Sequence, residues 1–228
     1  MKLLLTCEHG GHTIPKMFAD MFKDNKTTLQ SHRGFDIGAL DVFNYLKPLS
    51  DYSNFSTTSR LLIELNRSLH HRHLFSEFSK SLSPLHKERL IERYYKVYRN
   101  SVVQYISENI NKGDVILHVS VHSFTPVLND ITRHCDIGLL YDPIKAEESQ
   151  FCKHFKSELH LENPNLKVRF NYPYRGTADG FTTHLRRLFP DNYIGIEIEI
   201  NQKFASKNSM PSSLKHQMYS ALKSSIIR

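Results

Sequence analysis

Residues 114–122 read Asp-Val-Ile-Leu-His-Val-Ser-Val-His, and this stretch decides the fold class. Its dense β-branched and apolar residues predict a buried strand. The short apolar run of residues 2–7 predicts another, and so do residues 192–200, in which every second residue is Ile. Weaker patterns predict further strands over residues 60–65, 135–141 and 166–172.

Helices are predicted between these strands, most clearly over residues 84–111, where Ser83 can cap the helix and Pro84 suits its first turn. Further helices are predicted over residues 36–47, 146–159 and 210–227. This alternation is typical of an α/β fold whose sheet is covered by helices on both faces. We find no repeat, linker or change in composition. We therefore expect a single domain over residues 1–228 with a mostly parallel, mixed sheet.

Composition excludes several classes of protein. The chain has 228 residues, of which 39% are hydrophobic and 23% charged, as in ordinary globular proteins and unlike disordered ones. No stretch approaches the roughly 18 apolar residues of a membrane span. Glu8 and His9 end the first apolar run too early for a signal peptide. Three cysteines without a CxxC pair indicate a reducing compartment, so we expect a cytoplasmic protein.

Polar residues gather where the predicted strands end, and in an α/β sheet ligands bind at that edge. The last strand carries Glu197 and Glu199, which are two apart and therefore share a face. Two carboxylates on one face of a buried strand need a cation, a metal or a hydrogen-bond network to meet them. The residues at the other strand ends are Glu8, His9, Asn66, Arg67 and His122.

These residue types fit a mononuclear zinc hydrolase, which needs about three nitrogen or oxygen ligands and an open position for water. His9 and His122 are the first candidate ligands, and the third is Glu8, His12 or Asp36. Strand alternation disfavours Glu8, because neighbouring strand residues point to opposite faces.

The remaining strand-end residues suit the other roles of such a site. A Glu that is not a ligand would take the proton from the attacking water, and Glu199 or Glu197 suits that role. A pair of arginines would bind a substrate carboxylate in bidentate fashion.

Several motifs occur in order between roughly residues 3 and 205, and together they resemble the N-formylglutamate amidohydrolase family. The motifs are Cys7-Glu8-His9-Gly10-Gly11, Gly34-Phe35-Asp36-Ile37-Gly38-Ala39, Ser59-Arg60-Leu61-Leu62-Ile63-Glu64-Leu65-Asn66-Arg67, His122-Ser123-Phe124, Asn171-Tyr172-Pro173-Tyr174, Asp179-Gly180-Phe181 and Ile198-Glu199-Ile200-Asn201-Gln202. The chain departs from the family pattern at Glu64, where Asp is common, and at His12, where Asn or Thr is common.

The resemblance implies a phosphorylase/hydrolase-like fold, the broad architecture of zinc carboxypeptidases and cell-wall amidases. It also implies metal-assisted hydrolysis of a C–N amide bond, with formate released in the family's named activity. We therefore expect a zinc-dependent amidohydrolase of amino-acid metabolism that acts on a small anionic N-acyl amino acid such as N-formylglutamate.

Each candidate residue then has an expected role. Zn²⁺, or another divalent metal, would be bound by His9, Asp36 and His122, with Glu8 and His12 as alternative third ligands. The general base would be Glu199, with Glu197 as its alternative. Substrate binding would fall to Arg60, Asn66, Arg67 and Arg175.

Three alternatives remain open. The same fold could serve a peptidase or a cell-wall amidase. The net charge of +7 permits an anion-binding or nucleic-acid-binding protein that uses the basic helix over Lys87–Arg99. We find no RNP, helix-turn-helix or zinc-finger pattern, which makes nucleic acid an unfavoured partner. A Ser or Cys nucleophile is also disfavoured, because Ser123 and Cys7 lack a GxSxG elbow. The sequence leaves the oligomeric state open.

Overall fold

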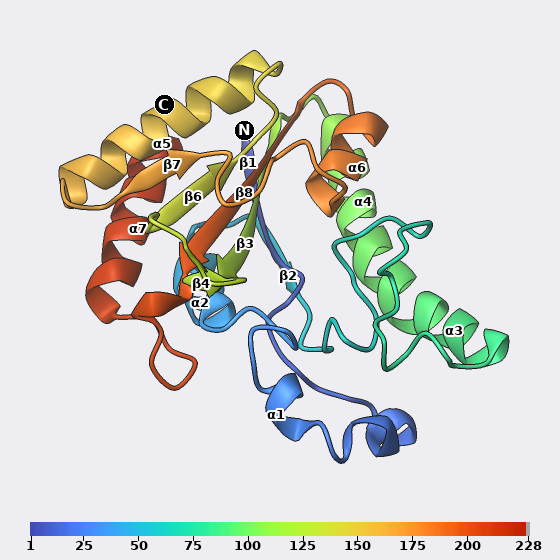
Figure 1. The fold of residues 1–228 in the computed structure, drawn as a ribbon. Helices are drawn as coiled ribbons and strands as arrows, with labels where there is room; N and C mark the ends of the chain where they lie inside the picture. Colours follow the sequence, from blue (N-terminus) through green and yellow to red (C-terminus); the bar gives the residue numbers. More distant parts are fainter. Residues whose placement is uncertain (227–228) are drawn as a thin grey trace.

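The computed structural model describes residues 1–226, which are built around one six-stranded sheet (Figure 1). The strand order is β2-β1-β3-β8-β6-β7. Strands β1, β2, β3 and β8 are parallel, β6 runs antiparallel to β8, and β7 is parallel to β6. The predicted mostly parallel, mixed sheet is therefore confirmed. The strands are β1 (Lys2–Cys7), β2 (Tyr52–Phe55), β3 (Ile116–Phe124), β6 (Ile137–Leu140), β7 (Val168–Phe170) and β8 (Tyr193–Asn201).

Three helices cover one face of the sheet: α2 (Ala39–Leu46), α5 (Ala146–Glu162) and α7 (Ser212–Ile226) (Figure 1). Alternate residues of the central strands point into this layer and are apolar. Examples are Leu5 in β1, Val119 in β3 and Ile198 in β8, all fully buried. This face is an ordinary hydrophobic core that holds the strands in place.

The opposite face is covered by α3 (Pro84–Leu90), α4 (Val97–Ile110) and α6 (Phe181–Leu188), with a π-helical segment over Ile91–Lys96 joining the first two. This layer is apolar only at the amino ends of the strands, where Leu4, Ile116 and Tyr193 are buried. Shorter elements complete the chain: α1 (Lys26–Leu29), the hairpin of β4 (Val127–Leu128) and β5 (Ile131–Thr132), and 3-10 turns over Lys16–Phe22, Lys47–Leu49 and Gln202–Phe204.

Toward the carboxyl ends of the strands this second face becomes polar while staying buried. His118 in β3 lies 2.7 Å from the Thr6 hydroxyl through Nε2 and 2.7 Å from the Tyr193 hydroxyl through Nδ1. Burial lowers the pKa of His118 to about 4, so this ring is neutral. Both of its ring nitrogens have hydrogen-bond partners. The same face carries Ser120 and His122 beyond it. On one face of β3, the hydrogen-bonded His118 is thus followed by Ser120 and His122, which lie at the candidate site.

The structure corrects the predicted strand over residues 60–65. This segment is a buried turn in which the amide of Leu62 donates to the carbonyl of Ser59, and the parallel edge strand is β2. The apolar residues of this turn pack into the hydrophobic cluster beneath α3, α4 and α6, which we call the second core. The predicted helix over 36–47 begins only at Ala39, because Gly38 before it has a φ of +79°.

The other predicted elements are confirmed within a few residues, including the long helix over 84–111, which has a π-helical segment inside it. The predicted end of the last helix, residue 227, lies outside the described residues. Sequence patterns did not predict β2 or α6. None of the helices described in residues 1–226 combines the length and apolar character needed to cross a bilayer.

A buried ion pair ties the loop over residues 172–180 to the sheet. The Arg186 guanidinium donates to Glu148 Oε1 at 2.7 Å, to the Gly195 carbonyl at 2.7 Å and to the Gly176 carbonyl at 2.6 Å. Glu148 in turn accepts from the amides of Gly195 and Asp142. Helices α5 and α6, strand β8 and the loop are thereby fixed to one another.

We predict that Glu148→Ala destabilises the protein by about 3–5 kcal/mol, because it leaves the Arg186 cation buried without its carboxylate. The matched control is Glu147→Ala, an exposed neighbour on the same helix, which should cost about 0.5 kcal/mol or less. Urea unfolding followed by circular dichroism measures both. Equal stability losses in the two variants would contradict the assigned role of the pair.

Candidate active site

One cavity of about 170 Å³ lies at the carboxyl edge of β1, β3 and β8. It brings together every residue given a primary role from the sequence, from six separate segments of the chain. Residues 8–12, 59–67 and 172–180 contribute loops, β3 and β8 contribute strand positions, and Asp36 precedes α2. The lining residues are His9, Asp36, Arg60, Asn66, Arg67, His122, Ser123, Tyr174, Arg175, Ala178, Asp179, Glu197 and Glu199.

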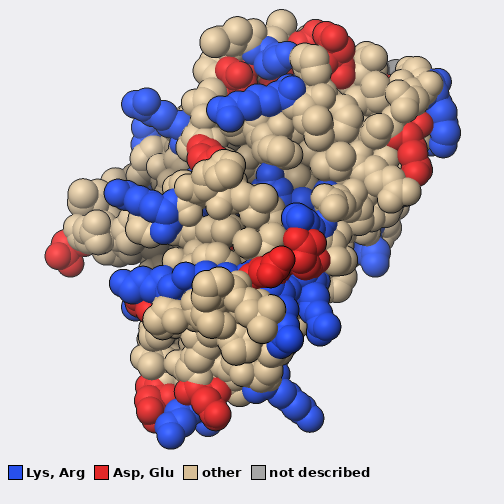
Figure 2. Space-filling view, turned by 90° about the vertical axis from the view of Figure 1, so that its right-hand side faces the viewer, with Lys and Arg blue, Asp and Glu red and all other residues tan. Residues whose placement is uncertain are grey.

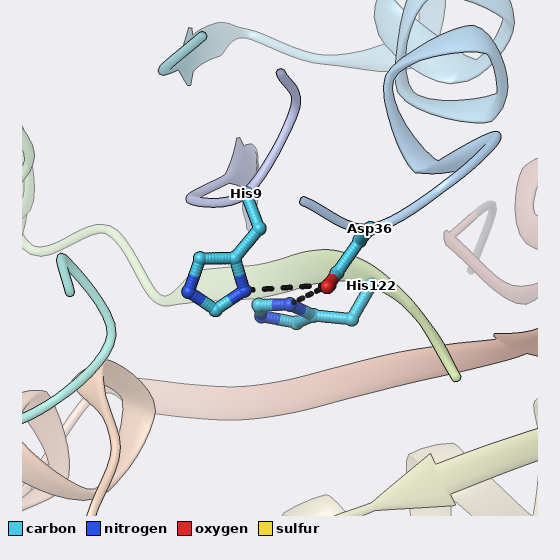
Figure 3. A group of neighbouring side chains, drawn as sticks. All are labelled: His9, Asp36 and His122. Carbon is cyan, nitrogen blue, oxygen red and sulfur yellow. Dashed lines mark hydrogen bonds and ion pairs between the residues drawn. The ribbon is translucent and has the colours of Figure 1, made fainter. Parts of the chain in front are cut away.

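At the base of the cavity two histidines face one carboxylate (Figure 3). Nδ1 of His122 lies 2.8 Å from Asp36 Oδ2, and Nδ1 of His9 lies 3.3 Å from the same oxygen. All three residues are buried. Their three donor atoms lie within 4.8 Å of one another. Three ligand atoms thus converge from three segments on one small volume.

A second carboxylate stands behind each imidazole. Nε2 of His9 contacts Glu64, and Nε2 of His122 lies 3.0 Å from Glu8 Oε2. Glu8 also accepts hydrogen bonds from the hydroxyls of Tyr98 at 2.8 Å and Ser120 at 2.6 Å. Such partners fix the orientation of a histidine ring and leave its other nitrogen directed at a metal.

The carboxylates favour protonated imidazoles when no cation is present. Burial acts to lower the pKa of His122, but the hydrogen bonds that its ring donates to Asp36 and Glu8 raise this pKa well above the ordinary value. The pKa of His9 is also raised, since the charges of Glu64 and Asp36 outweigh burial and the nearby Arg60 guanidinium. This strongly negative environment attracts positive charge to the position between the two Nδ1 atoms.

The two glutamates of β8 share the cavity but differ in their partners. Glu197 accepts a hydrogen bond from the Thr182 hydroxyl. Glu199 lies opposite His122 in the β3–β8 register, and its Oε2 is buried with no hydrogen-bond partner. Burial, together with the charges of Asp36 and Glu197, raises the pKa of Glu199 to about 8. A carboxylate oxygen left without a partner in a cavity is a group available for reaction.

The arginines of the cavity also separate into two kinds. Arg60 donates to Glu64 Oε2 at 2.6 and 3.0 Å and to Asp36 Oδ1 at 3.2 Å, so its guanidinium is held by the carboxylates of the site. Arg67 donates to the backbone carbonyl of Asp179. Arg175 lines the cavity and has no hydrogen bond or ion pair to the side chains of residues 1–226. Arg175 is therefore the cation most available to a ligand.

The two alternative third ligands lie away from the cavity. Glu8 is fully buried behind His122 with both oxygens hydrogen-bonded. His12 packs on the ring of Phe35 with centroids 4.8 Å apart and lines a different surface hollow. The side chain that converges with His9 and His122 is that of Asp36.

Sequence reasoning did not find the residues that hold the site in place. Glu64 received no role, although its spacing of four residues from Arg60 was a usable signal in retrospect. Tyr98 lies within the helix predicted over residues 84–111 and received no role, yet its hydroxyl donates to Glu8. Such contacts join residues about 90 positions apart and carry no local sequence pattern.

The basic helix segment over Lys87–Arg99 does not form a continuous cationic surface. Figure 2 shows the side of the molecule on which α3, α4 and α6 lie, and its Lys and Arg side chains are dispersed among other residues. Lys96 pairs with Glu92, and Arg99 is buried. This arrangement gives no support to a nucleic-acid footprint, which needs accessible cations along one face.

Comparison with known proteins agrees with the motifs. The sequence model of the N-formylglutamate amidohydrolase family matches residues 1–205. No protein of curated function matches the chain in sequence. A solved gene product of Agrobacterium tumefaciens is 25% identical, with a TM-score of 0.78 over 98% of this chain and 91% of that one.

Two further solved structures are similar at lower identity. The N-formylglutamate amidohydrolase of Ralstonia eutropha JMP134 is 14% identical, with a TM-score of 0.74 over 98% of this chain and 92% of that one. The CwlD amidase of Clostridioides difficile is 13% identical, with a TM-score of 0.44 over 99% and 98%. The Ralstonia structure shows the same fold as this chain.

The raised pKa of Glu199 predicts a pH-dependent stability in chelator-treated protein. The unfolded chain releases this proton near pH 4.5, whereas the folded protein keeps it until about pH 8. The folded state therefore binds more protons between these values, and its stability falls as the pH rises. Glu199→Gln removes this loss, so its Tm advantage over wild type should grow from pH 5 to pH 8, to on the order of 10 °C, and then level off.

Differential scanning calorimetry across that pH range measures the effect, with Glu147→Gln as an exposed control whose Tm difference stays constant. A Tm difference for Glu199→Gln that does not change with pH would contradict the assigned environment of this carboxyl.

Proposed function

The chain belongs to the N-formylglutamate amidohydrolase family, and we propose that it is a metal-dependent enzyme that hydrolyses the amide bond of a small N-acyl amino acid, N-formylglutamate foremost. The observation that carries this proposal is the convergence of His9, Asp36 and His122 beside the unpartnered oxygen of Glu199.

The donor set fits a divalent metal such as zinc. Two imidazole nitrogens and one carboxylate oxygen are a common three-ligand set for catalytic zinc. Both imidazoles are backed by carboxylates, as histidine ligands of metals usually are. When bound, the ion would supply a water of lowered pKa and polarise the amide carbonyl.

The protein's own residues would handle the protons. The Glu199 carboxylate takes a proton from the attacking water as the oxygen bonds to the amide carbon. The C–N bond then breaks, and Glu199 returns that proton to the leaving amine. For an N-formyl substrate the products are formate and a free amino acid. Glu197, whose carboxylate already accepts from Thr182, stays a supporting group in this scheme.

Substrate carboxylates would meet the cationic wall of the cavity. Arg175 and Arg67 are the proposed anchors, and Asn66 lies beside them with its Oδ1 accepting from the Phe181 amide. Arg60 is instead proposed to hold Asp36 and Glu64, since both carboxylates already occupy its donors. A cavity of about 170 Å³ suits a small substrate better than a polymer.

The cysteines suit a reducing compartment. Cys7, Cys135 and Cys152 are all free and buried. Burial raises the pKa of each thiol above its ordinary value, which keeps the thiols protonated and unreactive. We therefore keep the cytoplasmic location as part of this proposal.

Metal content tests the first half of the proposal. Untagged protein supplied with zinc should contain about one zinc per chain by elemental analysis, and His122→Ala should lose it, because one of three ligands is removed. His12→Ala is the matched control and should keep its zinc, since His12 lies outside the cavity. Zinc retained in His122→Ala, or lost in His12→Ala, would contradict the assignment.

Turnover tests the second half. Zinc-loaded protein should release formate from N-formyl-L-glutamate, and Glu199→Gln should keep its zinc while kcat falls by about 10²–10⁴-fold. Glu197→Gln should lose far less, because its carboxylate is proposed to be a supporting group. Formate release is followed with a coupled dehydrogenase assay. Full activity in Glu199→Gln would exclude this residue as the base, and no turnover of any N-acyl amino acid by zinc-loaded wild type would overturn the proposed reaction.

A further inference from the structure

A second cavity, of about 420 Å³, lies on the other side of the loop that carries Asn66 and Arg67. It opens between α4, the segment over residues 68–70 and α6. None of the residues that line it is acidic, and seven can donate hydrogen bonds: Ser68, His70, Tyr95, Lys96, Arg99, Asn100 and His184.

The deepest of these residues, Arg99, is a buried cation without a carboxylate. Arg99 has only 4% of its surface exposed to solvent. The guanidinium is stacked between the rings of Phe181 and Tyr95, at 4.2 and 4.9 Å from their centroids. Nη1 donates to the carbonyls of Leu65 at 3.1 Å and Arg67 at 3.2 Å. In residues 1–226 no acceptor meets Nε or Nη2, and neither atom is sealed from solvent.

The other deeply buried arginine shows what is missing here. Arg186 has Glu148 at 2.7 Å and accepting carbonyls on its remaining nitrogens. Buried charges in proteins are normally paired in this way. Burial lowers the pKa of Arg99, and the neutral rings and carbonyls around it replace only part of its lost hydration. The free edge of the guanidinium therefore favours an anion in the cavity.

We propose that this cavity binds a small molecule through an oxyanion group, which the Arg99 guanidinium anchors and the surrounding donors complete. The bound oxyanion accepts from Nε and Nη2 of Arg99, while Asn100 and His184 line the same space. Arginine matches the geometry of phosphate and carboxylate oxygens in bidentate fashion. The site is distinct from the catalytic cavity and does not rest on the proposed reaction.

The site also has a structural connection to the catalytic cavity. Nη1 of Arg99 holds the two carbonyls that flank Asn66, and the Tyr95 hydroxyl donates to the Arg67 carbonyl at 2.7 Å. The same loop presents Asn66 and Arg67 to the catalytic cavity. An anion on the free edge of Arg99 thus contacts the guanidinium that holds both backbone neighbours of Asn66, whose side chain faces the catalytic cavity.

Binding of inorganic phosphate, with acetate as the carboxylate counterpart, tests the proposal by isothermal titration calorimetry at constant ionic strength. Wild type should bind one of the two saturably, and which one binds identifies the oxyanion. Asn100→Asp places a negative charge in the cavity and should weaken binding by about tenfold or more. Asn111→Asp makes the same change at the exposed end of the same helix and should bind as wild type does.

A second matched pair, Lys96→Glu against the exposed Lys112→Glu, should give the same contrast. Arg175→Ala reports on binding in the catalytic cavity. Equal affinities in Asn100→Asp and Asn111→Asp would overturn the proposal, and so would binding that is lost only in Arg175→Ala. The absence of saturable binding of both anions to wild type would overturn it as well.

Discussion

Much of this structure depends on one constraint, the burial of charged groups at the carboxyl edge of the three central strands. Glu8, Asp36, Glu64 and Glu199 all lie at or behind a small cavity, where carboxylates repel one another and have lost most of their water. Two imidazoles and the Arg60 guanidinium meet three of them. Glu199 alone keeps an oxygen without a partner. A divalent cation between the histidines would relieve this excess of negative charge.

The two faces of the sheet have different roles, one in stability and the other in the chemistry of the site. The face of the sheet under α2, α5 and α7 is apolar along the central strands, so it holds the sheet without contributing to the site. On the opposite face, a buried polar network replaces part of the hydrophobic core. Buried ion pairs such as Glu148–Arg186 fix the loops around this network. The catalytic side chains are therefore positioned by rigid strands and by hydrogen-bonded neighbours, as a preorganised site requires.

Much of the candidate site could be predicted from the sequence, because the ends of parallel strands meet at one edge of a sheet. That rule placed His9, His122 and Glu199 together although they are far apart in the chain. Alternation along a strand also indicated that Glu8 points away from His9, and Glu8 does lie behind His122. Asp36 lies in a loop before α2, so strand patterns alone left it as one of three candidate third ligands, and the motifs shared with the family favoured it.

The remaining features depend on tertiary contacts that leave no local pattern. The apolar run over residues 60–65 has the composition of a strand but forms a turn, because its side chains are buried in the second core. Helix α6 begins Phe-Thr-Thr-His, which favours a helix only weakly, and tertiary packing of Phe181 and Leu185 decides its conformation. The contacts from Glu64 to His9 and from Tyr98 to Glu8 likewise follow from the assembled sheet.

The central claim is that the position between the two histidines is a metal centre, and anomalous diffraction at the zinc edge from zinc-loaded crystals tests it most directly. The account predicts a single strong peak at about 2.0–2.2 Å from Nδ1 of His9, Nδ1 of His122 and a carboxylate oxygen of Asp36. A peak at the surface histidines His71 and His73 with nothing between His9 and His122 would contradict it.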